Sequence, residues 1–525
     1  MGDATDVDGI QPPAYSIATQ AVYNGVIGSF LYGYMLCCLN SCGGLLPVVF
    51  NWCNSDWQGD CLNSRINSGL INAILYLGAA AGALLTGRPF MARGARFQLI
   101  VSDWFFIVGG LVGACAMGFQ CLLVSRILSG VGLGISAIAA PLYIAEVSPR
   151  EVRGFHSAKH GLYIAVGLLA AEVIGIPQGP PPTGPHDLLA GINSWYWRGI
   201  LAFPAFLALL QVMLMQWALP IDPPSFLVQQ GRIQDARRLL YKFYGITPPS
   251  PCLEGNAASL QNKAVVKLEL QIQDLATATA EAKAIKRITI AQAICDPFLR
   301  CSLCVGFFLA SFQQLTGINA LMAYSNGLFA EAGTPPQYLE LASVTMCVAN
   351  VLVSFLSTKL VDGWGRRTLL LWGATAQAIS MAAMIYLADF VPEQFRGLFC
   401  ITCFSIFVVS FSAGLGAITW LWLSEIYPME IRGPALSACG VVKWLSCFAV
   451  VLVSRFLNLR SSCILFGSVS AIGTVGMWLW IVETKGCSME DSPMTPRSGR
   501  SNSTLMSPKD AAMYQKMVDD EEDEA

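Results

Sequence analysis

Apolar runs of about 20 residues dominate the chain and constrain its fold more than any other feature. A helix of that length, rising 1.5 Å per residue, crosses the ~30 Å hydrocarbon core of a bilayer. Charged residues make up only 13% of the chain, against about 25% in an average globular protein. The runs lie at 17–38, 68–87, 97–118, 121–145, 158–177, 198–220, 298–329, 341–361, 369–390, 397–423, 435–456 and 463–482. We therefore predict an all-α membrane protein with twelve transmembrane helices.

The runs form two groups of six that repeat one another. The segment Ala145–Gly154 after the fourth run matches Ser424–Gly433 after the tenth, with the same interval from Glu146 to Arg153 as from Glu425 to Arg432. Two pseudo-symmetric bundles with a site between them are typical of transporters. We expect an N-terminal tail at 1–16, six-helix bundles at 17–220 and 297–484, a linker with short helices at 221–296, and a disordered tail at 485–525.

Lysine and arginine residues gather in the even-numbered loops, and this bias predicts the orientation. Such loops stay cytoplasmic, so we expect the linker and both chain ends to be cytoplasmic. We expect no removable signal peptide, because the first apolar run lacks both a basic n-region and a small-residue cleavage site. The sequence also lacks the basic, aromatic-rich patch that nucleic acid requires. Cys53 and Cys61 share the first odd-numbered loop. We predict that they form a disulfide if this loop lies outside the cell.

Polar residues interrupt the seventh apolar run between Gln313 and Asn319. Buried amides without partners cost free energy, so these groups should face a bound solute, a cavity or another helix. In an unbroken helix Gln314 and Asn319 would point about 140° apart, and they converge only if the helix breaks near Gly317. Asn326 returns to nearly the same face as Asn319. Hydrogen bonds between helices are the alternative, but several polar residues beside a break favour a binding site.

Motifs at matching intervals resemble those of a known family. They are the run from Gln313 to Asn319, the paired Glu/Arg loops, Gly365-Arg366-Arg367 and Glu483-Thr484-Lys485-Gly486. Over residues 28–486 the chain is similar to the sugar porters of the major facilitator superfamily, most of all to the hexose transporters of apicomplexan parasites. The resemblance implies the major facilitator fold and a facilitative hexose transporter of the plasma membrane, working by alternating access. No cofactor, metal or enzymatic activity is implied. Proton-coupled members place an Asp where this chain has Met35, so a uniporter is favoured.

The resemblance also implies site residues. The sugar contacts fall on Gln313, Gln314, Asn319, Asn350 and Trp420. Amides both donate to and accept from sugar hydroxyls, and an indole ring packs on the C–H face of a sugar. Tyr324 falls on an extracellular gate position, and we assign Asn326 to the same gate. Charged residues at cytoplasmic helix ends are expected to form a second gate: Arg96, Glu146, Arg153, Asp362, Arg366, Arg367, Glu425 and Arg432.

Two departures from the family pattern open alternatives. Gly161 replaces a sugar-binding Gln, and Lys443-Trp444 replaces Asn-Trp. Lys443 lies about 15 Å into the membrane, where an ammonium costs roughly 2.5–3.5 kcal/mol. It either lines the central site with Trp444 and alters substrate choice, or it is a bystander that extends towards the cytoplasm. The alternatives to a hexose transporter are therefore a carrier of a polyol or an anion, with or without proton coupling, and a sugar sensor that does not transport.

Overall fold

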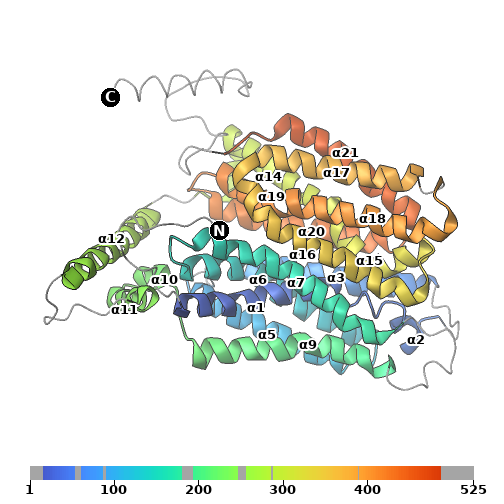
Figure 1. Ribbon diagram of the computed structural model, residues 1–525, viewed down its shortest axis with the longest axis horizontal. Coiled ribbons are helices and arrows are strands. Elements are labelled where there is room, and N and C mark those ends of the chain that lie inside the picture. The colour runs from blue at the N-terminus through green and yellow to red at the C-terminus, as the bar shows by residue number, and fades with distance from the viewer. Residues whose placement is uncertain are drawn as a thin grey trace.

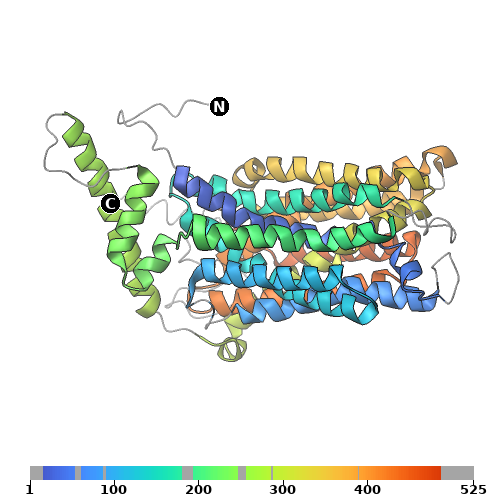
Figure 2. The same ribbon diagram turned by 90° about the horizontal axis from the view of Figure 1, so that it is seen from below.

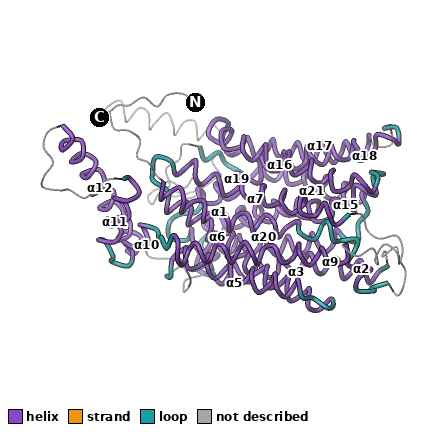
Figure 3. The backbone as a smooth tube through the Cα atoms, turned by 60° about the horizontal axis from the view of Figure 1, so that its bottom comes forward, coloured by secondary structure: helices purple, strands orange, loops and turns teal. Residues whose placement is uncertain are grey.

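The computed structural model describes residues 16–53, 61–86, 90, 92–179, 193–245, 256–284, 288–387 and 390–485. Within these ranges the secondary structure is helical and no strand occurs (Figure 3). Apart from Ser16 and Lys485, the tails expected at 1–16 and 485–525 lie outside the described residues.

The membrane domain has twelve spans in two halves that lie side by side (Figure 1). The first half consists of α1 (Ser16–Cys37), α3 (Leu62–Leu85), α5 (Gly94–Ala114), α6 (Phe119–Val147), α7 (Arg153–Gly175) and α9 (Asn193–Met213). The second consists of α14 (Pro297–Leu315) with α15 (Ile318–Glu331), α16 (Leu339–Trp364), α17 (Arg366–Leu387), α18 (Glu393–Phe411) with α19 (Ala417–Ile426), α20 (Arg432–Ser454) and α21 (Leu459–Trp480).

The length and surface of these helices suit a bilayer. Eleven spans in the described part of the chain are long and apolar enough to cross a membrane, and α1 adds a twelfth helix of 22 residues. Large apolar side chains point outward, among them Phe206, Phe355, Ile379, Leu398 and Ile472. Such a surface is unfavourable in water and favourable in lipid. The twelve-helix prediction is confirmed.

Helix α3 begins earlier than its apolar run predicts. It starts at Leu62, six residues before the run, because the sulfur of Cys61 caps it by accepting the Ser64 N–H at 3.4 Å. Hydropathy does not detect this polar first turn. The linker contains the short helices α10 (Pro224–Gln229), α11 (Ile233–Tyr244) and α13 (Ile290–Cys295). It also contains α12 (Asn256–Ala284), whose 29 residues include no Pro or Gly that would stop the helix.

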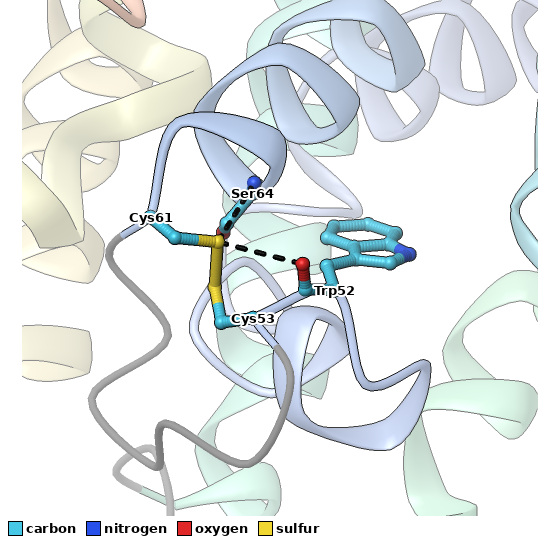
Figure 4. The surroundings of a disulfide bond; sticks show 4 residues. All are labelled: Trp52, Cys53, Cys61 and Ser64. Carbon is cyan, nitrogen blue, oxygen red and sulfur yellow. Dashed lines mark hydrogen bonds between the residues drawn. A yellow bond between two sulfur atoms is a disulfide. The ribbon is translucent and has the colours of Figure 1, made fainter.

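The linker helices define one end of the bundle. Helices α10, α11 and α12 lie beyond the spans at this linker end (Figures 1 and 2). The opposite end carries α2 (Leu46–Val49; Figure 1) and a disulfide between Cys53 and Cys61 (Figure 4), and we call it the disulfide end. The expected pairing of these two cysteines is present.

Close helix packing sets the shape of the first half. Gly78 and Gly82 of α3 meet Gly130 and Gly134 of α6 so closely that a Cβ at any of them would collide with a backbone carbonyl of the other helix. Small residues allow such an approach in membranes. The two halves then meet through α3 against α20, α7 against α16, and α1 against α15. Side chains from distant parts of the sequence are brought together at these contacts.

Candidate functional site

The seventh span is broken where the sequence predicts. Helix α14 ends at Leu315 and α15 begins at Ile318, and between them Gly317 has φ +89°, a left-handed conformation that favours glycine. The break turns two amides towards each other. Asn319 Nδ2 donates a hydrogen bond to Gln314 Oε1 at 2.5 Å.

The hydrogen bonds continue from these amides into a chain. Gln314 Nε2 donates to Gln313 Oε1 at 3.3 Å, and Gln313 Nε2 donates to the Leu415 carbonyl at 2.9 Å. Asn319 Nδ2 also contacts Cys447 Sγ on α20 at 3.3 Å. We call Gln313, Gln314 and Asn319 the amide chain. Its members are largely buried, and their remaining donors and acceptors form a polar surface inside an apolar bundle.

Lys443 lies between the two halves and does not extend to the linker end of the bundle. Its Nζ donates to the hydroxyl of Tyr32, in α1 of the first half, at 3.2 Å. Three aromatic rings surround the ammonium, with centroids 4.2 Å away for Trp444, 5.3 Å for Trp420 and 5.7 Å for Tyr32. Rings at such distances stabilise a desolvated cation. The sequence left two positions open for Lys443, in the central site or extended towards one end. The structure favours the central site.

His160 of the first half faces the same region. Its Nδ1 lies 2.8 Å from Ser29 Oγ, and the ring is close enough to Lys443 for an electrostatic interaction. Gly161, next to His160, and Gly440, one turn before Lys443 and Trp444, both border open space, since a Cβ built on either would meet no heavy atom within 4 Å. Gly440 is nevertheless a buried residue. Gly161 is an exposed residue, so the buried open space is the one beside Gly440, one turn from Lys443.

Trp444 and Asn350 have partners that sequence reasoning could not supply. The Trp444 ring stacks on Tyr76 with centroids 6.1 Å apart and meets Tyr32 edge-on at 5.9 Å, so it also packs the two halves together. The Asn350 side-chain oxygen accepts a hydrogen bond from Ser412 at 2.5 Å. Among the described residues, the printed bonds of Asn350 stay in the second half and do not reach the amide chain.

A second polar cluster joins the halves at the disulfide end. Asn40 Nδ2 contacts both carboxylate oxygens of Glu172, at 3.1 and 3.0 Å, and Ser325 Oγ of the second half, at 2.8 Å. Ser343 connects Ser325 to Asn326, and Asn326 Nδ2 donates to Glu340 Oε1 at 2.7 Å. We call these residues the disulfide-end network: Asn40, Glu172, Ser325, Asn326, Glu340 and Ser343.

This network separates Asn326 from the amide chain, although both belong to the same span. The backbone of Tyr324 leaves the helical region with φ −124° and ψ 16°, which turns Asn326 towards Glu340. Tyr324 itself donates to the Val451 carbonyl at 3.3 Å. Sequence reasoning missed Asn40, Glu340 and Ser343. The one available signal was the presence of polar Asn40 and Glu340 within apolar stretches of sequence.

The charged residues predicted as a gate lie at the linker end, and the ion pairs and hydrogen bonds named below connect residues of the same half or of the adjoining linker. Arg366 forms an ion pair with Glu425 at 3.3 Å, and Glu483 accepts hydrogen bonds from the backbone N–H groups of Arg366 and Arg367. Arg432 Nε donates to the Tyr427 carbonyl. In the first half Arg96 pairs with Asp222 at 3.2 Å. Asp222 and Glu483 were not foreseen as partners.

Glu146 and Arg153 also lie together at the linker end, near enough to interact electrostatically. The side chain of Asp362 lies outside the described residues. The ion pairs and hydrogen bonds above therefore organise each half by itself at the linker end, whereas those of the disulfide-end network join the halves.

Comparison with known proteins gives the chain a consistent set of relatives. Residues 22–494 match the sugar (and other) transporter family. Hexose transporter 1 of Toxoplasma gondii is 30% identical over 91% of this chain and 82% of its own length. Hexose transporter 1 of Plasmodium falciparum is 27% identical over 91% of this chain and 92% of its own. An inward-open structure of the xylose transporter XylE from E. coli superposes with a TM-score of 0.68 at 22% identity, covering 90% of this chain and 98% of that one.

Proposed function

Because the chain belongs to the sugar (and other) transporter family, we propose that it carries a hexose across a membrane by alternating access. The observation that carries this proposal is the broken seventh span, where the amide chain converges. Amides that donate and accept suit the hydroxyls of a sugar. We assign sugar contacts to Gln314, Asn319 and Trp420, with Gln313 holding Gln314 in place.

We infer facilitated diffusion as the mode of transport. Met35 in α1 has no ionisable group, so it cannot exchange a proton during the cycle. A uniporter needs only two conformations of similar free energy that expose the site in turn. In this proposal the disulfide-end network is the closed gate on one side, and the ion pairs of the linker end are the partners that rearrange on the other.

The proposed orientation puts the linker end in the cytoplasm and the disulfide end outside the cell. The excess of basic residues at the linker end supports the first assignment. The Cys53–Cys61 disulfide supports the second, since disulfides persist in oxidising surroundings. We place the protein in the plasma membrane, where a hexose uniporter would supply sugar from outside.

Uptake of labelled hexoses into cells that lack their own hexose transporters tests the proposal. We expect saturable uptake of glucose or fructose, counterflow against preloaded unlabelled sugar, and no loss of initial rate when an uncoupler collapses the proton gradient. Absence of counterflow with surface-expressed protein would contradict transport. A rate that falls with the uncoupler would replace the uniporter by a symporter.

A further inference from the structure

The ammonium of Lys443 has more hydrogen-bond donors than its surroundings occupy. It carries three N–H groups, and in the described part of the chain the hydroxyl of Tyr32 accepts one of them. The rings of Trp444, Trp420 and Tyr32 stabilise the charge without neutralising it. Among the described residues no carboxylate lies within 4.0 Å of Nζ. A desolvated cation without a counter-ion favours the binding of an anion.

A second basic side chain approaches from the other half. Ser29 holds His160 through Nδ1, which leaves Nε2 as the nitrogen that can bind a ligand. His160 of α7 and Lys443 of α20 are close enough to interact electrostatically. An anion between them would contact both halves at once, accepting hydrogen bonds from Lys443 Nζ and from His160 Nε2–H.

The sugar-binding groups lie one helical turn away. Cys447, which contacts Asn319 Nδ2 at 3.3 Å, follows Lys443 by four residues on α20. The buried open space beside Gly440 lies one turn from Lys443. A sugar whose hydroxyls bind to the amide chain would therefore have its substituents about one helical turn of α20 from the Lys443 ammonium.

We propose that this site prefers a hexose derivative bearing a carboxylate, such as a hexuronate, over the neutral hexose. The carboxylate binds to Lys443 Nζ and His160, the ring hydroxyls bind to Gln314 and Asn319, and Trp420 packs on the sugar face. This inference rests on the proposed function, because it assigns the substrate class of the same site.

The experiment compares neutral and acidic sugars on the full-length protein in proteoliposomes. Uptake of radiolabelled glucose and radiolabelled glucuronate is measured, and each unlabelled sugar competes against the other. We expect glucuronate to inhibit glucose uptake about tenfold more strongly than unlabelled glucose does, because hydrogen bonds between charged groups are stronger than neutral ones. Equal or weaker inhibition by glucuronate would overturn the preference.

Variants of Lys443 test whether this residue causes the preference for glucuronate. Lys443→Asn should remove the preference for glucuronate, and Lys443→Arg should keep most of it. Lys159→Asn is a matched control, since Lys159 is also a buried lysine of the membrane domain but lies over the rings of Tyr23 and Phe155. If Lys443→Asn does not fold, the wild-type competition and Lys443→Arg still decide the question.

The outcomes separate this inference from the proposed function. Transport of glucose with no binding of glucuronate overturns the inference and leaves hexose transport standing. Transport of glucuronate alone supports the inference and overturns the choice of a neutral hexose. Transport of neither sugar, by protein shown to be folded, overturns both. If the Lys443→Asn variant still prefers glucuronate, another residue recognises the carboxylate, and the role of Lys443 is overturned.

Discussion

The side-chain amide of Asn319 donates a hydrogen bond to the side-chain oxygen of Gln314 at 2.5 Å, across the break between α14 and α15. Five positions separate the two residues, and a continuous helix would turn their side chains apart. The break therefore creates the polar surface of the site.

Replacing either amide should impair transport without unfolding the protein. We expect Asn319→Ala and Gln314→Ala to lower the rate of sugar uptake per surface molecule at least tenfold, because each loses a hydrogen bond worth about 1–3 kcal/mol in a buried site. Gln211→Ala is the control, since this buried amide donates to the Asn24 carbonyl within the first half. Uptake that is unchanged in the amide-chain variants, or equally reduced by Gln211→Ala, would contradict the assignment.

The break itself can be tested with a matched pair of glycines. Gly317→Ala should destabilise the protein by more than about 1–2 kcal/mol, because alanine resists φ +89° and its Cβ would collide with the Phe466 ring. Gly327→Ala, in the same α15, has no heavy atom within 4 Å of the new Cβ and should be neutral or slightly stabilising. Thermal unfolding of the two purified variants in detergent measures the difference. Equal melting temperatures would show that the left-handed turn is dispensable.

Removing Asn40 should loosen the disulfide-end network. Asn40→Ala loses the contacts to Glu172 and Ser325, so the halves separate more readily at that end. Cys42 is a natural reporter, because it is a buried free cysteine close to Glu172 and Glu340, and we expect a membrane-impermeant thiol reagent to reach it only when that end opens. We expect faster labelling of Cys42, quantified by mass spectrometry, relative to the wild type.

The exposed Cys115 normalises the reaction, and Asn350→Ala is the control variant, since the Asn350 hydrogen bonds stay in the second half. A Cys42 labelling rate that does not rise in Asn40→Ala would remove this network from the gating scheme.

The Cys53–Cys61 disulfide provides a test of both stability and orientation. It joins two residues 8 positions apart in the sequence, so we expect reduction to cost about 2–3 kcal/mol of unfolding free energy. Calorimetry with and without reductant measures this loss.

On intact cells, an impermeant biotin reagent should modify the two sulfurs only after reduction. Modification that requires permeabilised cells would place this end in the cytoplasm and reverse the proposed topology.

The sequence alone determined the features that depend on local pattern. The length of each apolar run predicted the twelve spans, and the repeated Glu/Arg segments predicted the two halves. The polar interruption with a glycine predicted the break in the seventh span, because a helix cannot otherwise bring Gln314 and Asn319 together. Motif spacing led to the right family.

Only the tertiary structure decided which distant side chains meet. Lys443 contacts Tyr32 across 411 positions of sequence, Asn40 contacts Glu172 and Ser325, and Asn326 turns away to Glu340. Periodicity and run length are properties of a single helix. The partner of a side chain depends on the rotation and depth of one helix relative to another, and these are set by the packing of small residues and aromatic rings across the whole bundle.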